Sequence, residues 1–246
     1  MSFQGKTVVV IGATGVVGGG IVRKYLDAGA TVVGVSRSID NLTKLKVLHG
    51  IGEGVDFHEV VADFKDEPSA HAAKQAIDAV LHGKAIDHVV SVQGFVNFAK
   101  PPTQASAEAL RSALDDGLYN NLLAAKMFLP ELKGREHSTF TLVSGGLAHF
   151  PPPNPGLWLG TIKNAAINAL GHALTAETAH DKVRVNTVCI HFGVAPVGGN
   201  KNQLGLPAES DTLRLGSAFL GLARGTQKGQ LLCLSSWAEA DKLSAQ

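Results

Sequence analysis

Short apolar runs with the length of β-strands recur along the whole chain. They fall at residues 7–12, 31–36, 55–63, 87–94, 138–144, 183–190 and 230–235. Between them lie segments whose apolar residues have helical spacing, such as 18–29, 68–83 and 164–179. Strands that alternate with helices are typical of a parallel sheet covered on both faces. The pattern predicts a Rossmann-type, doubly wound α/β fold, with seven parallel strands and three layers.

The composition adds that the chain is globular and forms one domain. Of its 246 residues, 45% are hydrophobic and 17% are charged, far from the profile of a disordered protein. No repeat or linker divides it, so we expect a single domain over residues 1–246. No window approaches the ~18 continuous apolar residues of a membrane helix, and no secretion signal is recognisable. We therefore expect a cytoplasmic protein with no membrane partner.

Charge and cysteine content narrow the range of partners. The 22 basic and 21 acidic residues are spread along the chain and leave a net charge of +1, so we expect no nucleic-acid partner. Cys189 and Cys233 lie inside apolar, strand-like runs and are interpreted as small buried hydrophobic residues rather than a disulfide pair. A small-molecule substrate is the expected partner.

A glycine-rich turn follows the first predicted strand. Residues 12–18 read Gly-Ala-Thr-Gly-Val-Val-Gly and open into a helix predicted to begin near Val17. Glycines at Gly12, Gly15 and Gly18 allow a tight turn and a close approach of the backbone to a pyrophosphate, which the helix N-terminus would hold. The hydroxyl of Thr14 adds a further donor. The turn predicts a dinucleotide site; the alternative is that the glycines only allow close packing.

The end of the second predicted strand indicates which dinucleotide is bound. The sequence there is Ser36-Arg37-Ser38, with no acidic residue to pair with a ribose hydroxyl. An arginine at this place suits the 2′-phosphate of the adenosine ribose. We therefore expect NADP(H) rather than NAD, although Arg37 can also be interpreted as a solvated surface cation.

With these features placed, the chain resembles the short-chain dehydrogenase/reductase family from the first strand to Gly229-Gln230. The segment from Asp87 to Gly94 overlies the family pattern D-x-L-V-N-N-A-G, and the glycine turn is similar to the G-x-x-G-x-x-G of its extended and atypical branches. The resemblance implies that Asp63 contacts the adenine. It places four further residues beside the cofactor, namely Val17, Phe64, Val92 and Gly94.

The same resemblance identifies one catalytic position and loses another. Lys163 occupies the lysine of the family motif Y-x-x-x-K, which implies a role in binding the nicotinamide ribose, but the tyrosine position is Leu159. Leucine can neither donate nor accept the proton that accompanies hydride transfer. The family serine falls on Gly146 in an ungapped count, or on Ser144 if the following loop is two residues longer.

Two further family landmarks are altered. The family asparagine falls on Gly117, counted from a helix that we expect to end at Pro130, while Asn120 and Asn121 lie one turn later. The family's Pro-Gly pair after the sixth strand is either Ile190-His191 or Phe192-Gly193.

Other residues could replace the missing acid. His149 and His191 follow predicted strands, at the edge where doubly wound sheets gather their ligands, and histidine titrates in a useful range. Each can also be interpreted as a loop histidine bonded to the backbone. Lys163 itself could donate a proton if its pKa is lowered, and Lys100 is a weaker candidate. The catalytic candidates are therefore Lys163, Ser144, His191 and His149, while Tyr25 and Tyr119 are expected to be structural.

Apolar residues near the same edge predict the substrate pocket. The candidates are Phe95, Phe98, Phe150, Trp158 and Leu159, flanked by loops at 149–156 and 197–210 of the kind that cover substrates. We expect an NADP(H)-dependent oxidoreductase with a non-standard active site, acting on a small-to-medium, fairly apolar substrate. Polarised C=C or C=N bonds suit such a site better than simple ketones. The alternatives are a non-redox isomerase, lyase or cyclase, or a non-catalytic NADP(H)-binding protein. The resemblance also implies a dimer or tetramer formed through residues 105–129 and 160–179.

Overall fold

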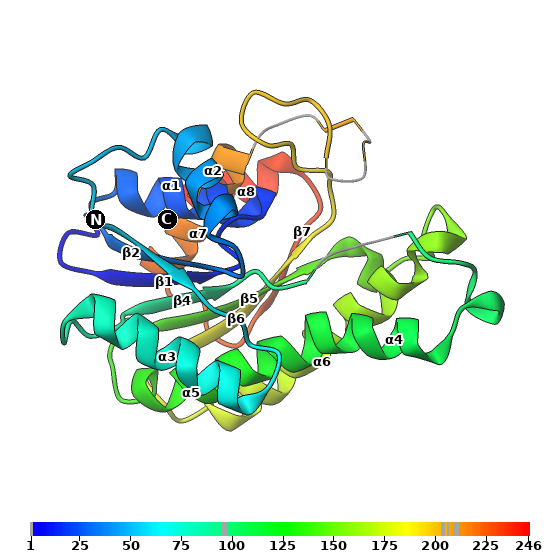
Figure 1. Ribbon diagram of the computed structural model, residues 1–246, viewed down its shortest axis with the longest axis horizontal. Helices are drawn as coiled ribbons and strands as arrows, with labels where there is room; N and C mark the ends of the chain where they lie inside the picture. The colour runs from blue at the N-terminus through cyan, green and yellow to red at the C-terminus, as the bar shows by residue number, and fades with distance from the viewer. Residues whose placement is uncertain (1, 95–97, 203–204, 206, 209–211) are drawn as a thin grey trace.

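The computed structural model describes residues 2–94, 98–202, 205, 207–208 and 212–246. One parallel sheet runs through the molecule in the order β3-β2-β1-β4-β5-β6-β7 (Figure 1). The strands are β1 (Thr7–Ile11), β2 (Thr31–Ser36), β3 (Phe57–Val61), β4 (His88–Ser91), β5 (Thr139–Gly145), β6 (Arg184–Ile190) and β7 (Leu231–Leu234). Each lies within one residue of a predicted run or inside it, so the predicted seven-stranded Rossmann-type fold is confirmed.

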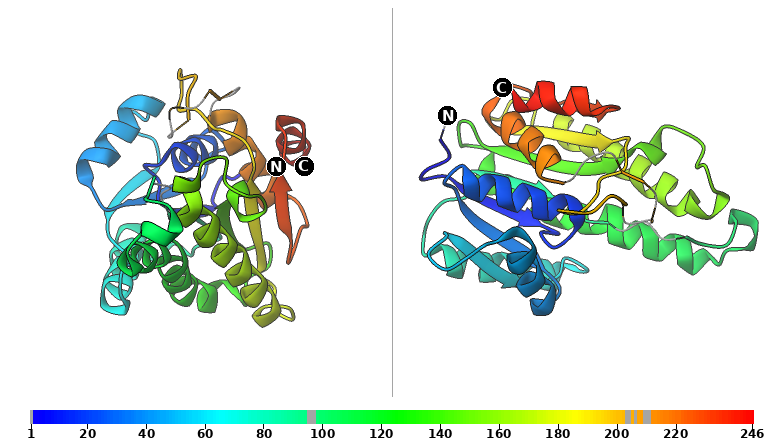
Figure 2. Two further views of the ribbon diagram at one scale, coloured as in Figure 1. Left: turned by 90° about the vertical axis from the view of Figure 1, so that its right-hand side faces the viewer. Right: turned by 90° about the horizontal axis from the view of Figure 1, so that it is seen from above.

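Helices cover both faces of this sheet. They are α1 (Val16–Asp27), α2 (Ile39–His49), α3 (Glu67–Leu81), α4 (Ala107–Leu114), α5 (Asn120–Leu132), α6 (Trp158–Glu177), α7 (Thr212–Arg224) and α8 (Trp237–Ser244). One face carries α1, α2, α7 and α8, and the other carries α3, α5 and α6 (Figures 1 and 2). Within the described part of the chain, no helix is both long and apolar enough to span a bilayer.

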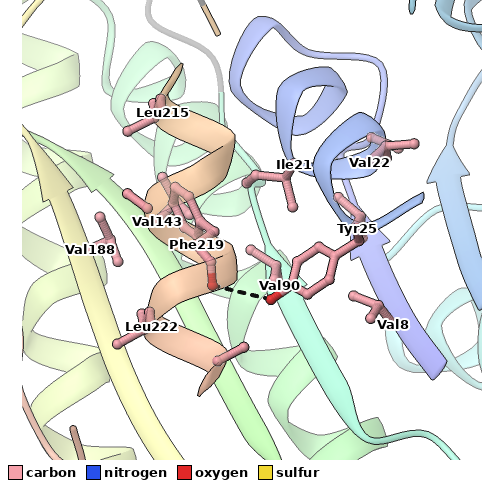
Figure 3. Close-up of a cluster of buried hydrophobic side chains, with 14 of the residues drawn as sticks. Val8, Ile21, Val22, Tyr25, Val90, Val143, Val188, Leu215, Phe219 and Leu222 are labelled. Atoms are coloured by element: carbon pink, nitrogen blue, oxygen red, sulfur yellow. Dashed lines mark hydrogen bonds between the residues drawn. The ribbon is translucent and has the colours of Figure 1, made fainter. Parts of the chain in front are cut away.

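The alternation of side chains along β1 divides the core into two halves. Val8 and Val10 point into the half beneath α1 and α7, whereas Val9 and Ile11 point into the half beneath α3 and α5. Burial on both faces explains why the strands read as continuous apolar runs. In the first half, the Tyr25 hydroxyl donates to the Phe219 carbonyl at 3.2 Å (Figure 3). Tyr25 is therefore a structural residue, as expected.

The strand order reverses between β1 and β4, because β2 and β3 lie on one side of β1 and β4 to β7 on the other. Connections after these strands leave in opposite directions, which opens a crevice at their carboxyl ends. The segments that contain α4 and the turn before α6 extend beyond this edge of the sheet (Figure 1). The fold thus places the site where the glycine turn and Lys163 were expected to meet.

Helical structure between residues 105 and 132 differs from the prediction of one helix ending at Pro130. Between α4 and α5 lies a π-helix, Asp115–Tyr119, and α5 continues past Pro130 to Leu132. Proline removes one backbone donor from the last turn, but Phe128, Leu129 and Leu132 are buried there. Tertiary packing therefore holds a turn that the local sequence disfavours.

Candidate functional site

Two adjoining cavities lie at the carboxyl ends of the strands. The first, of about 350 Å³, is lined by the glycine turn and is called the glycine cavity. The second, of about 470 Å³, contains Lys163 and is called the lysine cavity. Gly15, Val92, Gln93 and Gly94 line both. A ligand with two linked parts can therefore occupy both cavities at once.

The glycine turn is shaped by close backbone contacts. Gly12 has a φ of +83°, and a side chain there would meet the Val92 carbonyl; a side chain at Gly18 would meet the Gly12 carbonyl. Gly15 differs, because the nearest atom to an added Cβ is the Gly12 carbonyl oxygen at 3.5 Å. Gly15 is also the N-cap of α1, with no side-chain cap bond. The turn thus presents an open surface and a helix N-terminus, which fits a pyrophosphate.

Most of the residues predicted to bind the cofactor line the glycine cavity. They are Gly12, Thr14, Gly15, Ser36, Arg37, Asp63, Phe64, Val92 and Gly94. The hydroxyls of Thr14 and Ser36 are 3.0 Å apart, and the Asp63 carboxylate accepts the Phe64 amide at 2.7 Å. The Arg37 guanidinium is exposed and lies 3.9 Å from the carboxylate of Asp116. It is an exposed cation in the lining of this cavity, and its contact with Asp116 is weak.

Three of the remaining cofactor candidates lie elsewhere. Gly18 is buried behind the turn, and Val17 lines the lysine cavity. Ser38 is the N-cap of α2, where its hydroxyl accepts the Asn41 amide at 3.3 Å. The structure therefore gives Ser38 a capping role, which the Ser-x-x spacing before a helix could have indicated.

Lys163 extends from α6 into the lysine cavity. The residue is only 2% exposed, and burial lowers the pKa of its ammonium group to about 8, partly opposed by Asp116. A side chain at Gly117 would overlap the Lys163 stem, and one at Gly94 would lie 3.3 Å from Nζ. The position where the resemblance places an asparagine is therefore a glycine that makes room for the lysine.

Ser144 and His191 also line the lysine cavity. The Ser144 hydroxyl donates to Asn168 Oδ1 at 2.5 Å. His191 Nε2 lies 3.4 Å from the Cys189 sulfur, and Nδ1 lies 3.4 Å from the Ser235 hydroxyl. Burial and the neighbouring His149 lower the pKa of His191. Both ring nitrogens of His191 therefore have protein partners.

The fourth catalytic candidate, His149, is not among the described residues that line the lysine cavity. Its Nε2 lies 3.2 Å from Asn168 Nδ2, and its ring centroid is 5.1 Å from that of His191. The two histidines predicted separately are thus neighbours, with His191 in the lining of the lysine cavity and His149 next to it.

A polar network that sequence reasoning missed forms the floor between the cavities. Ser91 donates to Asn121 Oδ1 at 2.6 Å, and Gln93 Nε2 donates to both the Ser91 hydroxyl and the Asn120 carbonyl at 3.1 Å. Asn121 and Ser91 are fully buried. The polar residue Gln93 after an apolar strand could have indicated this network in the sequence, because buried polar groups require hydrogen-bond partners.

The predicted substrate residues separate into different places. Phe150 lines the lysine cavity. Trp158 and Leu159 are not among its lining residues, and Leu157 lines it instead. Phe95 lies outside the described residues. Trp158 instead donates its indole N–H to the Lys100 carbonyl at 2.9 Å, while Phe98 is 58% exposed. A 3₁₀ turn at Pro155–Leu157, just before α6, brings Leu157 into the lining.

Comparisons with known proteins agree with this geometry. Residues 12–196 match the family model described as enoyl-(acyl carrier protein) reductase. The short-chain dehydrogenase/reductase iacG of Pestalotiopsis fici is 28% identical over 77% of this chain and 74% of its own length. A probable NADP-dependent dehydrogenase of Haemophilus influenzae is 25% identical over 74% of this chain and 69% of its own. A short-chain type dehydrogenase/reductase structure from Mycobacterium ulcerans superposes with a TM-score of 0.80 at 20% identity, covering 98% and 91% of the two chains.

Proposed function

Because the chain belongs to the short-chain dehydrogenase/reductase family, we propose that it is an NADP(H)-dependent oxidoreductase that works without the family tyrosine. The observation that carries the proposal is the junction of the two cavities, where Gly94 lines both and lies against the Lys163 ammonium group. This arrangement suits a cofactor that extends from the glycine turn toward Lys163. A substrate would then occupy the rest of the lysine cavity.

The glycine cavity fits the adenosine and pyrophosphate parts of NADP(H). The Gly15 surface and the N-terminus of α1 would hold the pyrophosphate, and Arg37 would pair with the 2′-phosphate at the cavity mouth. The exposed contact of Arg37 with Asp116 is weak enough for a phosphate to displace it. The name of the Haemophilus influenzae relative gives further support for NADP.

The bound cofactor supplies a hydride, and the residues of this chain must stabilise the charge that the transfer leaves on the substrate. Lys163 is well placed for this task, because its ammonium group is cationic and lies beside Gly94, at the junction of the two cavities. With a pKa of about 8, the Lys163 ammonium group is mostly protonated at pH 7. Because this pKa is close to 7, the group can also release its proton during the reaction. Lys163 therefore acts as an electrostatic donor and as the proton source.

The lining of the lysine cavity indicates an apolar substrate. Apolar side chains, including Phe150, Leu157, Phe192 and Val194, and glycines make up most of its lining. The polar lining residues besides Lys163 are Gln93, Ser144, Asn164, His191 and Asn202. Leu159, one turn before Lys163 on α6, offers no proton. Polarised C=C and C=N bonds suit this site better than simple ketones, because they depend less on a strong acid beside an oxygen.

The presence of Leu159 also favours a second candidate, a non-redox enzyme that has kept the scaffold. Isomerisation, elimination or cyclisation needs a shaped cavity and a positioned donor, both of which the lysine cavity supplies.

Transfer of a deuterium label separates these candidates. Purified protein is incubated with NADPH deuterated at C4 and a panel of apolar activated alkenes, imines and ketones, and the products are analysed by mass spectrometry. The proposal predicts one deuterium in the product of at least one class, with matching oxidation of NADPH. Conversion of a panel compound without deuterium or NADPH oxidation would establish the non-redox candidate, and NADPH binding without any conversion would favour a binding protein.

A further inference from the structure

Four soft donor side chains meet beside the lysine cavity, and one of them, His191, is part of its lining. His149, Cys189, His191 and Cys233 each place one nitrogen or sulfur so that these atoms all lie within 4.8 Å of one another. The cluster contains no carboxylate, and neither cysteine forms a disulfide. Two thiols and two imidazoles form one of the donor sets that zinc uses in closed sites.

The sheet register produces this cluster. Cys189 on β6 pairs with Cys233 on β7, so their side chains leave the same face of the sheet side by side. His191 follows Cys189 by two residues and shares that face. A side chain at Gly146 would meet the His191 backbone at 2.8 Å, so this glycine lets the loop carrying His149 close over the strand ends.

Neighbouring polar groups orient the donors. His191 Nδ1 lies 3.4 Å from the Ser235 hydroxyl, which leaves Nε2 directed at the Cys189 sulfur, also at 3.4 Å. The Asn168 Nδ2 amide group donates to His149 Nε2 at 3.2 Å. Histidine ligands of metals usually donate their second ring N–H to an acceptor, as His191 Nδ1 can to the Ser235 hydroxyl, and this fixes the orientation of the ring.

We propose that His149, Cys189, His191 and Cys233 form a tetrahedral zinc site that ties the loop after β5 to the ends of β6 and β7. Zinc bonds of about 2.0–2.3 Å require donor separations of about 3.3–3.8 Å. The Cys189 to His191 separation already meets this, and the widest pair has to close by about 1 Å, which side-chain rotation supplies. Four protein ligands make the site structural, and it stiffens the wall that His191 contributes to the lysine cavity.

Metal content provides the test. Untagged protein, kept reduced, is incubated with zinc, dialysed against a weak chelator and analysed by mass spectrometry for metal per chain. We expect about one zinc per chain in the wild type, and a loss of at least tenfold in both His149→Ala and Cys233→Ser. His172→Ala, which removes an exposed histidine on α6, is the matched control and keeps the metal.

Cobalt substitution gives a second readout that does not depend on activity. Cobalt-loaded wild type should show thiolate-to-cobalt charge transfer and the visible bands of tetrahedral cobalt, with the charge transfer weakened in Cys233→Ser. His149→Ala changes an exposed residue, so it tests the site even if the cysteine variant fails to fold. Wild-type protein without stoichiometric metal, or equal metal content in wild type and both ligand variants, would overturn the proposal.

Discussion

At the residue scale, glycines beside Lys163 leave the space that its side chain occupies in the lysine cavity. Lys163 reaches the cavity because Gly117 and Gly94 carry no side chain to block it. The resemblance to the Y-x-x-x-K motif pointed to Lys163 on α6. Most residues of the glycine cavity were predicted because they follow strands. The sequence misplaced Trp158, because a short 3₁₀ turn directs its indole to the Lys100 carbonyl, and no local pattern encodes that contact.

The lowered pKa of Lys163 predicts a pH-dependent activity. If the ammonium form is the active one, kcat/KM is high below the pKa of about 8 and falls as the pH rises through it. In Lys163→Arg this decline should disappear, because the guanidinium stays charged, and kcat/KM should be lower at every pH, because arginine does not release the proton that Lys163 supplies. Lys163→Met should lose roughly 10²- to 10⁴-fold in kcat/KM at pH 7.

Steady-state kinetics from pH 6 to 10 check this prediction. Lys242→Met, which removes an exposed lysine on α8, serves as the control and should retain the wild-type profile. A wild-type profile that is flat through pH 8, or an unchanged decline in Lys163→Arg, would show that another group carries the proton.

At the element scale, the strands were predictable and the helix junction beside the site was not. Burial on both faces gives β1 and β2 continuous apolar runs, which are visible in the sequence, whereas the edge strand β3 is only partly buried. The π-helix at Asp115–Tyr119 leaves no comparable pattern in the sequence, and its Gly117 packs against the Lys163 side chain, which comes from α6. Functional sites are a frequent location for such π-helical turns.

The contact between Gly117 and Lys163 predicts the effect of adding one methyl group at residue 117. Gly117→Ala places a methyl group on the Lys163 stem and should displace the ammonium group, lowering kcat/KM at least tenfold. Gly134→Ala is the matched control, because no atom lies within 4 Å of the added carbon. Kinetics and thermal unfolding of both variants give the comparison. Equal activity in Gly117→Ala and Gly134→Ala would mean that the π-helix does not position Lys163.

At the scale of the whole molecule, the sheet separates the core into two halves. One buried residue of the sheet, His88, can take up a proton. His88 on β4 is 3% exposed, bonds Thr139 at 2.9 Å and packs against Phe3 and Tyr25. Burial lowers its pKa from 6.5 to about 4, partly opposed by Asp87. Its apolar neighbours were expected from the sequence, but a histidine in the core was not singled out, because its partners lie far along the chain.

The folded protein should therefore lose stability in acid. In the unfolded chain His88 binds a proton below pH 6.5, whereas in the folded protein it does so only near pH 4. The free energy of unfolding should therefore fall by about 2–3 kcal/mol as the pH is lowered from 6.5 to 4. Urea unfolding at pH 7 and pH 4.5 measures this difference. It should shrink in His88→Gln and persist in His180→Gln, an exposed control. The same acid sensitivity in both variants would assign it to other groups.

Equilibrium binding of NADPH and NADH, followed by calorimetry on wild type and Arg37→Ala, tests the central claim most directly. The account predicts that NADPH binds more tightly than NADH, and that Arg37→Ala weakens NADPH at least tenfold while leaving NADH within about twofold, since only NADPH carries the 2′-phosphate. Lys44→Ala, an exposed lysine on α2, is the control and should change neither affinity. Failure of the wild type to bind either dinucleotide, or equal affinities unaffected by Arg37→Ala, would contradict the account.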